Sequence, residues 1–289
     1  MKVRTKFNLV LLLALGLGIG VGGYLSQGLL ENNAKEEVFQ KAGIIMEAAM
    51  SVRRYTVDQI QPGFQKDIGN KFPPQVVPAY AATEVFNLLR QTYPDYTYKE
   101  ATLNPTNERD KASDWEADIV QQFRNFPDKK EIVGDRESAV GPTLYLARPI
   151  KIGAEACLRC HSTPATAPKS IISTYGDHGG FNWKLNEIVG AQIVSVPTAL
   201  AHKRAMVVFW VFILSLGGVF FGVFIVLNFM LGSIVIRPIV KMSKAAEKLS
   251  SGDMNVPEFP VHGRDEISML ANSFNLLRRS LEKAMSLLE

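Results

Sequence analysis

Two cysteines and one histidine lie together in the segment Cys157-Leu158-Arg159-Cys160-His161. This C-x-x-C-H spacing is typical of c-type haem attachment, in which the two thiols add to the two vinyl groups of the porphyrin and the next histidine lies beneath the iron. We therefore predict one covalently bound haem c, with thioether bonds to Cys157 and Cys160 and with His161 as the proximal iron ligand.

Three other chemistries compete for the two cysteines. A bare C-x-x-C redox pair needs a βαβ setting, which the sequence pattern does not show. Half of a zinc site needs further ligands, but the chain has only these two cysteines and its other histidines are scattered. A structural disulfide stays open as an alternative, although neither it nor the redox pair explains His161.

A second axial ligand would be a neutral sulfur or nitrogen donor. Met46 and Met50 lie one helical turn apart on the first long predicted helix, and His178 lies in a glycine-rich segment. Each methionine could instead fill a core, and an open five-coordinate iron is the fourth alternative. Arg53 and Arg54 are candidate partners for the haem propionates, because guanidinium pairs with carboxylate in a bidentate manner; they could equally form a solvated helix face.

The segment 31–205 must position this site, and it contains equal numbers of basic and acidic residues. Periodic apolar residues and breakers predict three helices, over 34–61, 77–93 and 111–126. Runs rich in Tyr, Val, Ile and Thr predict three strands, over 96–102, 143–150 and 188–196. Because helices come first and strands cluster late, we expect an α+β domain, an antiparallel sheet with helices on one side.

Two uncharged apolar runs, 8–30 and 206–231, flank this segment and are long enough to cross a hydrocarbon core of about 30 Å as helices. Lysines and arginines precede the first run and follow the second, so both termini are predicted to be cytoplasmic. The first run is long for a cleaved signal peptide and lacks an A-x-A site, which favours an uncleaved anchor. We expect an integral membrane protein with its sensor domain in the periplasm, or in a lumen if the source has internal photosynthetic membranes.

Glycines four residues apart recur in both runs, as Gly16/Gly20, Gly18/Gly22 and Gly218/Gly222. This spacing permits close helix approach in a dimer, but glycine is also simply common in membrane-spanning helices.

The tail after the second run has the pattern of two helices joined by a linker. Arg237-Pro238 opens the first helix, a turn at Gly252 ends it, and Asp265-Glu266 begins the second. Apolar residues of the second helix keep a three-four alternation, at Ile267, Leu270, Phe274, Leu277, Leu281, Ala284 and Leu288. Such a heptad seam needs a partner helix, so we expect a homodimer; an amphipathic helix lying on a membrane or a core is the alternative.

Several separated pieces of the segment 34–198 resemble the bacterial c-type haem-binding sensor domains of PAS-like fold. They are 52–56, 104–107 with Trp115-Glu116, 157–161, 180–183, and 187–197. The resemblance implies haem bound between the first long helix and the sheet, and a redox or gas-sensing role. A member resembling this chain uses a helix cysteine as distal ligand, and because this chain has no third cysteine the resemblance favours Met46, Met50 or an open site. The tail, over 233–285, resembles a HAMP relay, which implies a parallel four-helix bundle formed by two chains.

These expectations divide the chain into an N-terminal tail with the first span at 1–30, a haem-binding PAS-like domain at 31–205, the second span at 206–232 and a HAMP segment at 233–289. With 47% hydrophobic and 21% charged residues and a net charge of only +4, the chain fits neither a disordered protein nor a nucleic-acid binder. The sequence shows no nucleophile elbow, phosphate loop or catalytic triad, and no kinase, cyclase or methyl-accepting domain, so we expect a non-enzyme whose output lies in a separate cytoplasmic protein.

Two functions remain open from the sequence. One is a sensor that relays a redox or small-ligand signal through the HAMP segment, and the other is a dimeric membrane-anchored cytochrome that carries electrons. We favour the sensor, because a haem that only conducts electrons needs no bistable coiled coil. The sensor's partners would be membrane lipid, an electron donor or a small gas ligand, and the output protein.

Overall fold

Residues 2–64, 72–253, 255–261 and 263–285 are described in the computed structural model of this chain. They form two units, Gln27–Val208 and a second unit that joins Met1–Ser26 to Phe209–Glu289.

A four-stranded antiparallel sheet lies at the centre of the unit 27–208, with the strand order β1-β4-β3-β2. The strands are β1 Thr97–Thr102, β2 Ile132–Ser138, β3 Gly141–Lys151 and β4 Ile188–Pro197. The central strand β4 is buried along nearly its whole length, which is why its sequence is almost continuously apolar. The fold is α+β, and the three strands expected from the sequence are confirmed.

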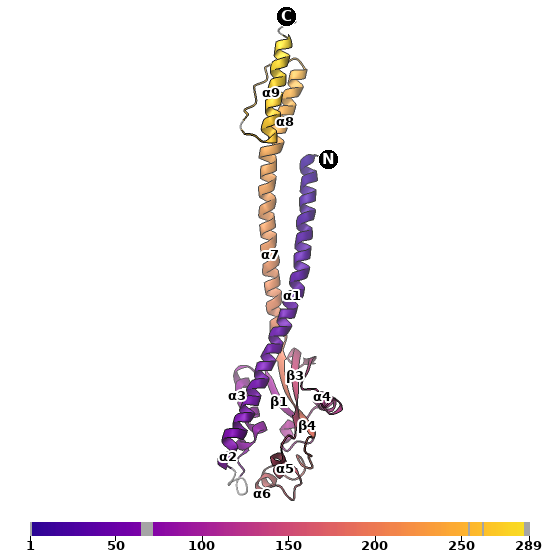
Figure 1. Ribbon diagram of the computed structural model, residues 1–289, viewed down its shortest axis with the longest axis vertical. Helices are drawn as coiled ribbons and strands as arrows, with labels where there is room; N and C mark the ends of the chain where they lie inside the picture. The colour runs from indigo at the N-terminus through magenta and orange to yellow at the C-terminus, as the bar shows by residue number, and fades with distance from the viewer. Residues whose placement is uncertain (1, 65–71, 254, 262, 286–289) are drawn as a thin grey trace. The chain divides into compact units, whose positions relative to one another are not determined.

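Helices surround this sheet and continue beyond it (Figure 1). Those of the unit 27–208 are the C-terminal part of α1 Val3–Tyr55, then α2 Gln61–Phe64, α3 Pro78–Thr92, α4 Asp114–Asn125, α5 Glu155–His161, α6 Lys169–Tyr175, and the short 3₁₀ turns Pro74–Val76 and Glu108–Asp110. The three expected helices are present. The first is a continuation of the first apolar run into one helix, and the third begins at a capping box, in which Ser113 and Glu116 satisfy each other's backbone N–H groups.

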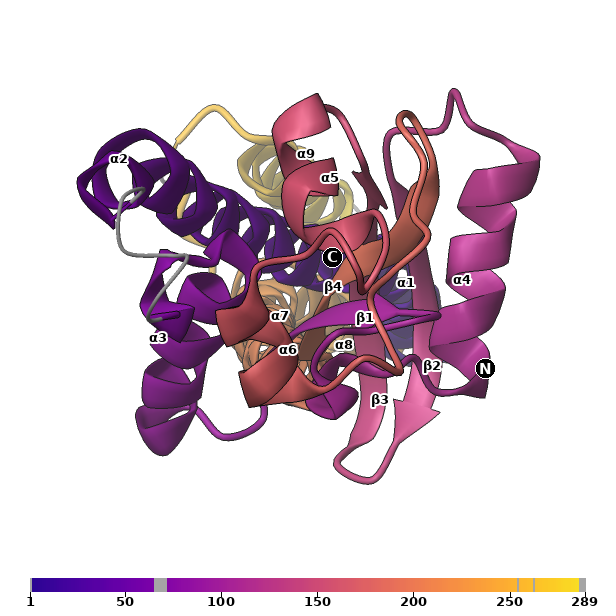
Figure 2. The ribbon, with the colours of Figure 1, turned by 90° about the horizontal axis from the view of Figure 1, so that it is seen from below.

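Helices cover both faces of the sheet, so the expectation of helices on one side is wrong (Figure 2). Alternate strand residues point to opposite faces. Tyr98 and Leu146 pack with α1 and α3, whereas Ala147 and Ile193 pack with Phe123 of α4. The second half of α1 and the helix α4 thus bury the two faces of one sheet.

A π-helical turn precedes a proline at two places in the chain. Thr56–Ile60 comes before Pro62, and Leu231–Ile236 comes before Pro238. A proline ring clashes with the carbonyl four residues earlier, and the wider π turn relieves this clash without ending the helix. This is why the first helix passes through Pro62, where the sequence pattern predicted its end.

The second unit contains the two apolar helical runs, the N-terminal part of α1 and most of α7 Ala199–Met230, and both helices are long and apolar enough to cross a membrane. A methyl group added at Gly18 or Gly22 would lie 3.3 Å from Phe220 or 3.5 Å from Leu216. These two glycines therefore permit close approach of the two helices within one chain.

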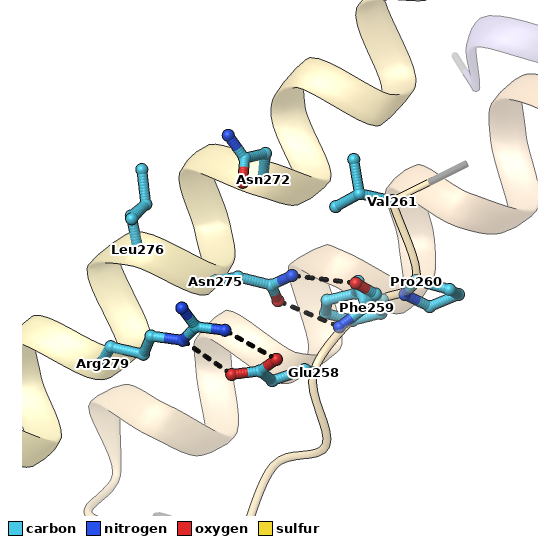
Figure 3. Close-up of a pocket in the computed structure, with 8 residues that line it drawn as sticks. All are labelled: Glu258, Phe259, Pro260, Val261, Asn272, Asn275, Leu276 and Arg279. Atoms are coloured by element: carbon cyan, nitrogen blue, oxygen red, sulfur yellow. Dashed lines mark hydrogen bonds and ion pairs between the residues drawn. The ribbon is translucent and has the colours of Figure 1, made fainter. Parts of the chain in front are cut away.

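Beyond the π turn, α8 Arg237–Ser250 and α9 Glu266–Met285 are joined by an extended connector that is fastened to α9 (Figure 3). The Asn275 side chain exchanges hydrogen bonds of 2.9 and 2.8 Å with the backbone N–H and C=O of Phe259. Arg279 forms a bidentate ion pair with Glu258, with N–O distances of 2.8 and 3.0 Å. Asn275 thereby satisfies both backbone groups of Phe259, which lies outside any helix.

Within one chain, α9 turns Ala271 and Asn275 inward and leaves much of its apolar seam uncovered. Leu270, Leu277 and Leu281 are 49%, 55% and 40% exposed. The helix therefore carries an apolar stripe in addition to the face that packs on α8 and the connector.

Candidate functional site

The short helix α5 carries both cysteines and His161 in seven residues. Cys157 and Cys160 are half-buried free thiols. Because they are three residues apart on a helix, their sulfur atoms lie on the same side. Burial raises the pKa of the Cys160 thiol, against the opposing charge of Arg159. The two thiols are thus adjacent and directed to one side.

The His161 ring is held in one orientation and one tautomer. Its Nδ1 lies 2.7 Å from the backbone oxygen of Gly180. A carbonyl oxygen only accepts, so Nδ1 carries the proton and Nε2 carries the lone pair. The ring also stacks on Trp183, with ring centroids 4.1 Å apart and an interplanar angle of 17°. Burial lowers the pKa of His161 against the raising effect of the Gly180 hydrogen bond, which favours the neutral ring that a metal requires.

The loop that supplies Gly180 is itself fixed from two directions. The Asn182 and Trp183 N–H groups donate to the carbonyls of Ser162 and His161, at 2.6 and 3.2 Å. On the other side, Asn104 Oδ1 accepts from the Gly180 N–H at 3.3 Å and its Nδ2 donates to the Phe181 carbonyl at 3.2 Å. Asn104, which follows the end of β1, thus positions the loop, and the loop positions the histidine.

Glycine is required at the centre of this loop. Gly180 has φ +80°, and a methyl group there would lie 1.8 Å from Thr106 Oγ1. At the neighbouring Gly179 it would lie 2.2 Å from the Pro105 carbonyl oxygen. No other residue permits this approach of the two backbones.

The C-x-x-C-H motif marks the segment that carries the ligand, but it does not reveal the residues that support this segment. Asn104, Gly180 and Trp183 occurred only within segments that carried the family resemblance, and the structure brings them together around His161. The adjacent glycines Gly179-Gly180 were the local signal, since such a pair often marks close backbone approach.

The three candidate distal ligands lie in different surroundings. Met46 is fully buried in the core with Phe86 and Val194, whereas Met50 is 37% exposed on the same helix. The His178 side chain is 95% exposed and pairs with Asp177, with an N–O distance of 3.1 Å. Of the two methionines, only Met50 is exposed at the surface of α1.

The two candidate propionate partners also differ. Arg53 forms an ion pair with Glu100, a carboxylate that is 3% exposed and also accepts a hydrogen bond of 2.7 Å from the Tyr98 hydroxyl. Burial, and then the charge of Glu100, raise the pKa of Tyr98 well above its ordinary value, so that it stays a donor. Arg54 is exposed and lies 3.4 Å from Asp58.

The donor set at α5 fits a covalently attached haem. Two free thiols on one side of a helix match the two vinyl groups, and a neutral imidazole with its Nδ1–H fixed presents Nε2 to a metal. Over the described residues, no group of three or more His, Cys, Asp and Glu side chains is arranged to hold a bare metal ion.

Two family models match parts of this chain. The Tll0287-like family matches residues 31–197, and the HAMP domain family matches residues 230–283. The crystal structure of the cyanobacterial heme-protein Tll0287 is similar over 56% of this chain and 95% of that chain, with 14% sequence identity and a TM-score of 0.44. No curated protein is significantly similar to this chain. The two family matches identify a membrane-anchored signal transducer with a haem-related sensor domain.

Proposed function

The chain belongs to the Tll0287-like family, a haem-protein family of PAS-like fold, and from that premise we propose that it binds one haem c through Cys157 and Cys160, with His161 as the proximal ligand. We further propose that the domain senses the redox state of this haem or a small molecule at its iron, and that the HAMP segment relays the change to a cytoplasmic protein.

The observation that carries this proposal is the fixed orientation of His161. A solvated loop histidine would need neither a stacked tryptophan nor a backbone acceptor for Nδ1, yet His161 has both. In a metal-bound imidazole, a hydrogen bond donated by the ring nitrogen that does not bind the metal sets the tautomer and raises the basicity of the other nitrogen. When bound, the haem would supply an iron that changes oxidation state and sixth ligand.

We propose Met50 as the sixth ligand in preference to Met46. Moving the Met46 sulfur to an iron would open a void in a closed core, which costs several kcal/mol, whereas Met50 already lies at the surface of α1. Met50→Ala should change the absorption spectrum of the reduced protein and lower its reduction potential, while Met46→Leu should leave both unchanged. The reverse pattern would assign Met46, and unchanged spectra in both variants would leave His178 or an open site.

The route for the signal is proposed to be the two helices that leave the sensor. The helix α1 is continuous from Val3 to Tyr55, and a single residue, Thr198, separates the end of β4 at Pro197 from the start of α7 at Ala199. We place the sensor outside the cytoplasm and both termini inside, as the flanking basic residues favour. The exposed stripe Leu270, Leu277 and Leu281 would pack against a second copy of the chain, because an unpaired stripe leaves apolar area in water.

Cross-linking in membranes separates the sensor from the electron carrier. Full-length protein that carries Leu277→Cys is treated with a bismaleimide, and Asn272→Cys serves as the control outside the stripe. Each sample is held either oxidised or reduced, and its haem spectrum is recorded. The sensor predicts that dimer yield at position 277 exceeds that at 272 and changes with the haem state or on addition of carbon monoxide. An unchanged yield together with fast, reversible haem reduction would support the electron carrier.

A further inference from the structure

A cleft of about 560 Å³ opens on the face of the sheet that α4 covers only in part. It is lined by α3, β1, the turn Glu108–Asp110, the start of α4 and the hairpin between β2 and β3. Neither Cys157, Cys160 nor His161 lines it. The volume lies within the range of pockets that hold small organic ligands.

Hydroxyl groups from three strands form the floor of this cleft. In the sheet register Thr97 is opposite Ser195, and Thr143 lies on β3 beside β4. Ser195 and Thr143 are 8% and 2% exposed, and Thr143 is hydrogen-bonded to Ser138 at 2.9 Å between their hydroxyl oxygens. A core-forming sheet would present aliphatic side chains here, so the floor is polar at buried positions where packing alone favours apolar residues.

At the wall of the cleft, the cation of Arg136 has no carboxylate partner among the described residues. The Arg136 guanidinium lies 4.0 Å above the centre of the Trp115 ring, and no ion pair to it occurs in the described part of the chain. Stacking fixes the plane of the guanidinium but leaves its N–H groups directed outward at the edge, where they can bind a carboxylate in a bidentate manner.

The remaining charges leave this cation uncompensated. The cleft is lined by four basic residues, Arg90, Lys99, Arg109 and Arg136, and by three acidic residues, Asp95, Asp110 and Glu116. Lys99 is paired with Glu116 at 2.7 Å, and Arg109 is paired with Asp110 at 3.6 Å and with Glu84, which does not line the cleft. The balance is one positive charge, which suits a ligand with a single negative charge.

We propose that this cleft binds a small, hydroxyl-bearing monocarboxylate, with its carboxylate on Arg136 and its hydroxyl groups on the floor formed by Thr97, Thr143 and Ser195. The site is independent of the haem, so its failure would leave the proposed function intact, and the reverse also holds. The protein would then respond to an organic anion as well as to the state of the haem.

Titration calorimetry on the full-length protein in detergent tests this proposal with lactate and gluconate as probes, and with glycerol and sorbitol as their uncharged counterparts. We expect binding of at least one carboxylate and of neither polyol. Arg136→Gln should weaken that binding by about 10- to 150-fold, the usual range for the loss of a charged hydrogen bond. Lys130→Gln, which removes the same charge outside the cleft, should leave it unchanged.

The haem spectrum and circular dichroism of each variant show whether it has folded. Ser195→Ala, which removes one floor hydroxyl and keeps Arg136, provides a second test that should weaken binding by a smaller factor. The proposal is overturned if neither carboxylate binds the wild type, if the polyols bind equally well, or if folded Arg136→Gln binds as tightly as Lys130→Gln.

Discussion

The hydrogen bonds of Asn104 predict that a residue with no contact to the cysteines controls the iron ligand. Asn104→Ala removes one bond from the Gly180 N–H and one to the Phe181 carbonyl. Each such bond contributes about 0.5 to 1.5 kcal/mol, and Asn104 is itself exposed, so we expect a loss of about 1 to 2 kcal/mol in the free energy of unfolding. Freed from Asn104, the loop would hold the Gly180 carbonyl less firmly against His161.

The effect on the ligand is measured separately from stability by acid titration of the haem absorption band. Loss of a group that orients a metal ligand typically lowers metal affinity about 10- to 100-fold. Because protons compete with iron for Nε2, the pH at which His161 leaves the iron should rise by about 1 to 2 pH units.

Asn107→Ala is the matched control for this titration. Asn107 lies in the same segment, but its Oδ1 accepts only from the Arg109 N–H, at 3.2 Å. If Asn104→Ala and Asn107→Ala titrate at the same pH as the wild type, the loop does not position His161 and the reasoning is refuted.

Three further changes test other parts of the structure. Glu100→Gln leaves the Arg53 guanidinium without its carboxylate and should lower the free energy of unfolding, measured by urea denaturation, by about 3 kcal/mol. The control Glu47→Gln changes a side chain that is 66% exposed and should lower it by less than about 1 kcal/mol. Equal losses would contradict the role of the buried pair. Burial raises the pKa of Asp110 to about 6 from 3.8, so the folded state binds this proton more tightly and the free energy of unfolding falls as the pH rises from about 4 to 6. Asp110→Asn should remove that fall, so that the free energy of unfolding increases by about 2 to 3 kcal/mol at pH 7.5 and does not change at pH 4. An increase that does not depend on pH would exclude this cause. Leu277→Lys should reduce bismaleimide dimer yield elsewhere on α9, because it places an ammonium in an apolar interface, and an unchanged yield would mean that this face does not pair.

Regular, strongly patterned elements were predictable from the sequence. The stripe of α1, the capping box of α4 and the apolar run of β4 each satisfy a local rule, so their helix and strand assignments are confirmed. The strand β2 was missed because it is an edge strand with charged and glycine residues, paired only with β3. The helices α5 and α6, of seven residues each, are too short to show a period.

The candidate site divides in the same way. A local spacing rule found Cys157, Cys160 and His161. The contact from Asn104 to Gly180 joins residues 76 positions apart, and no local pattern encodes such a pairing. Met46 and Met50 are equivalent in the sequence but lie in the core and at the surface, because small rotations about a helix axis decide which face is enclosed.

Covalent attachment of haem at α5 is the central claim, and haem staining tests it most directly. The full-length chain is produced in a host that matures c-type cytochromes and is separated by denaturing electrophoresis, beside Cys157→Ala/Cys160→Ala and the control His178→Ala, which keeps both attachment cysteines. The account predicts a band with peroxidase activity in the wild type and in His178→Ala, and none in the double cysteine variant. A wild type without the band, or a band that persists in the double variant, would contradict it.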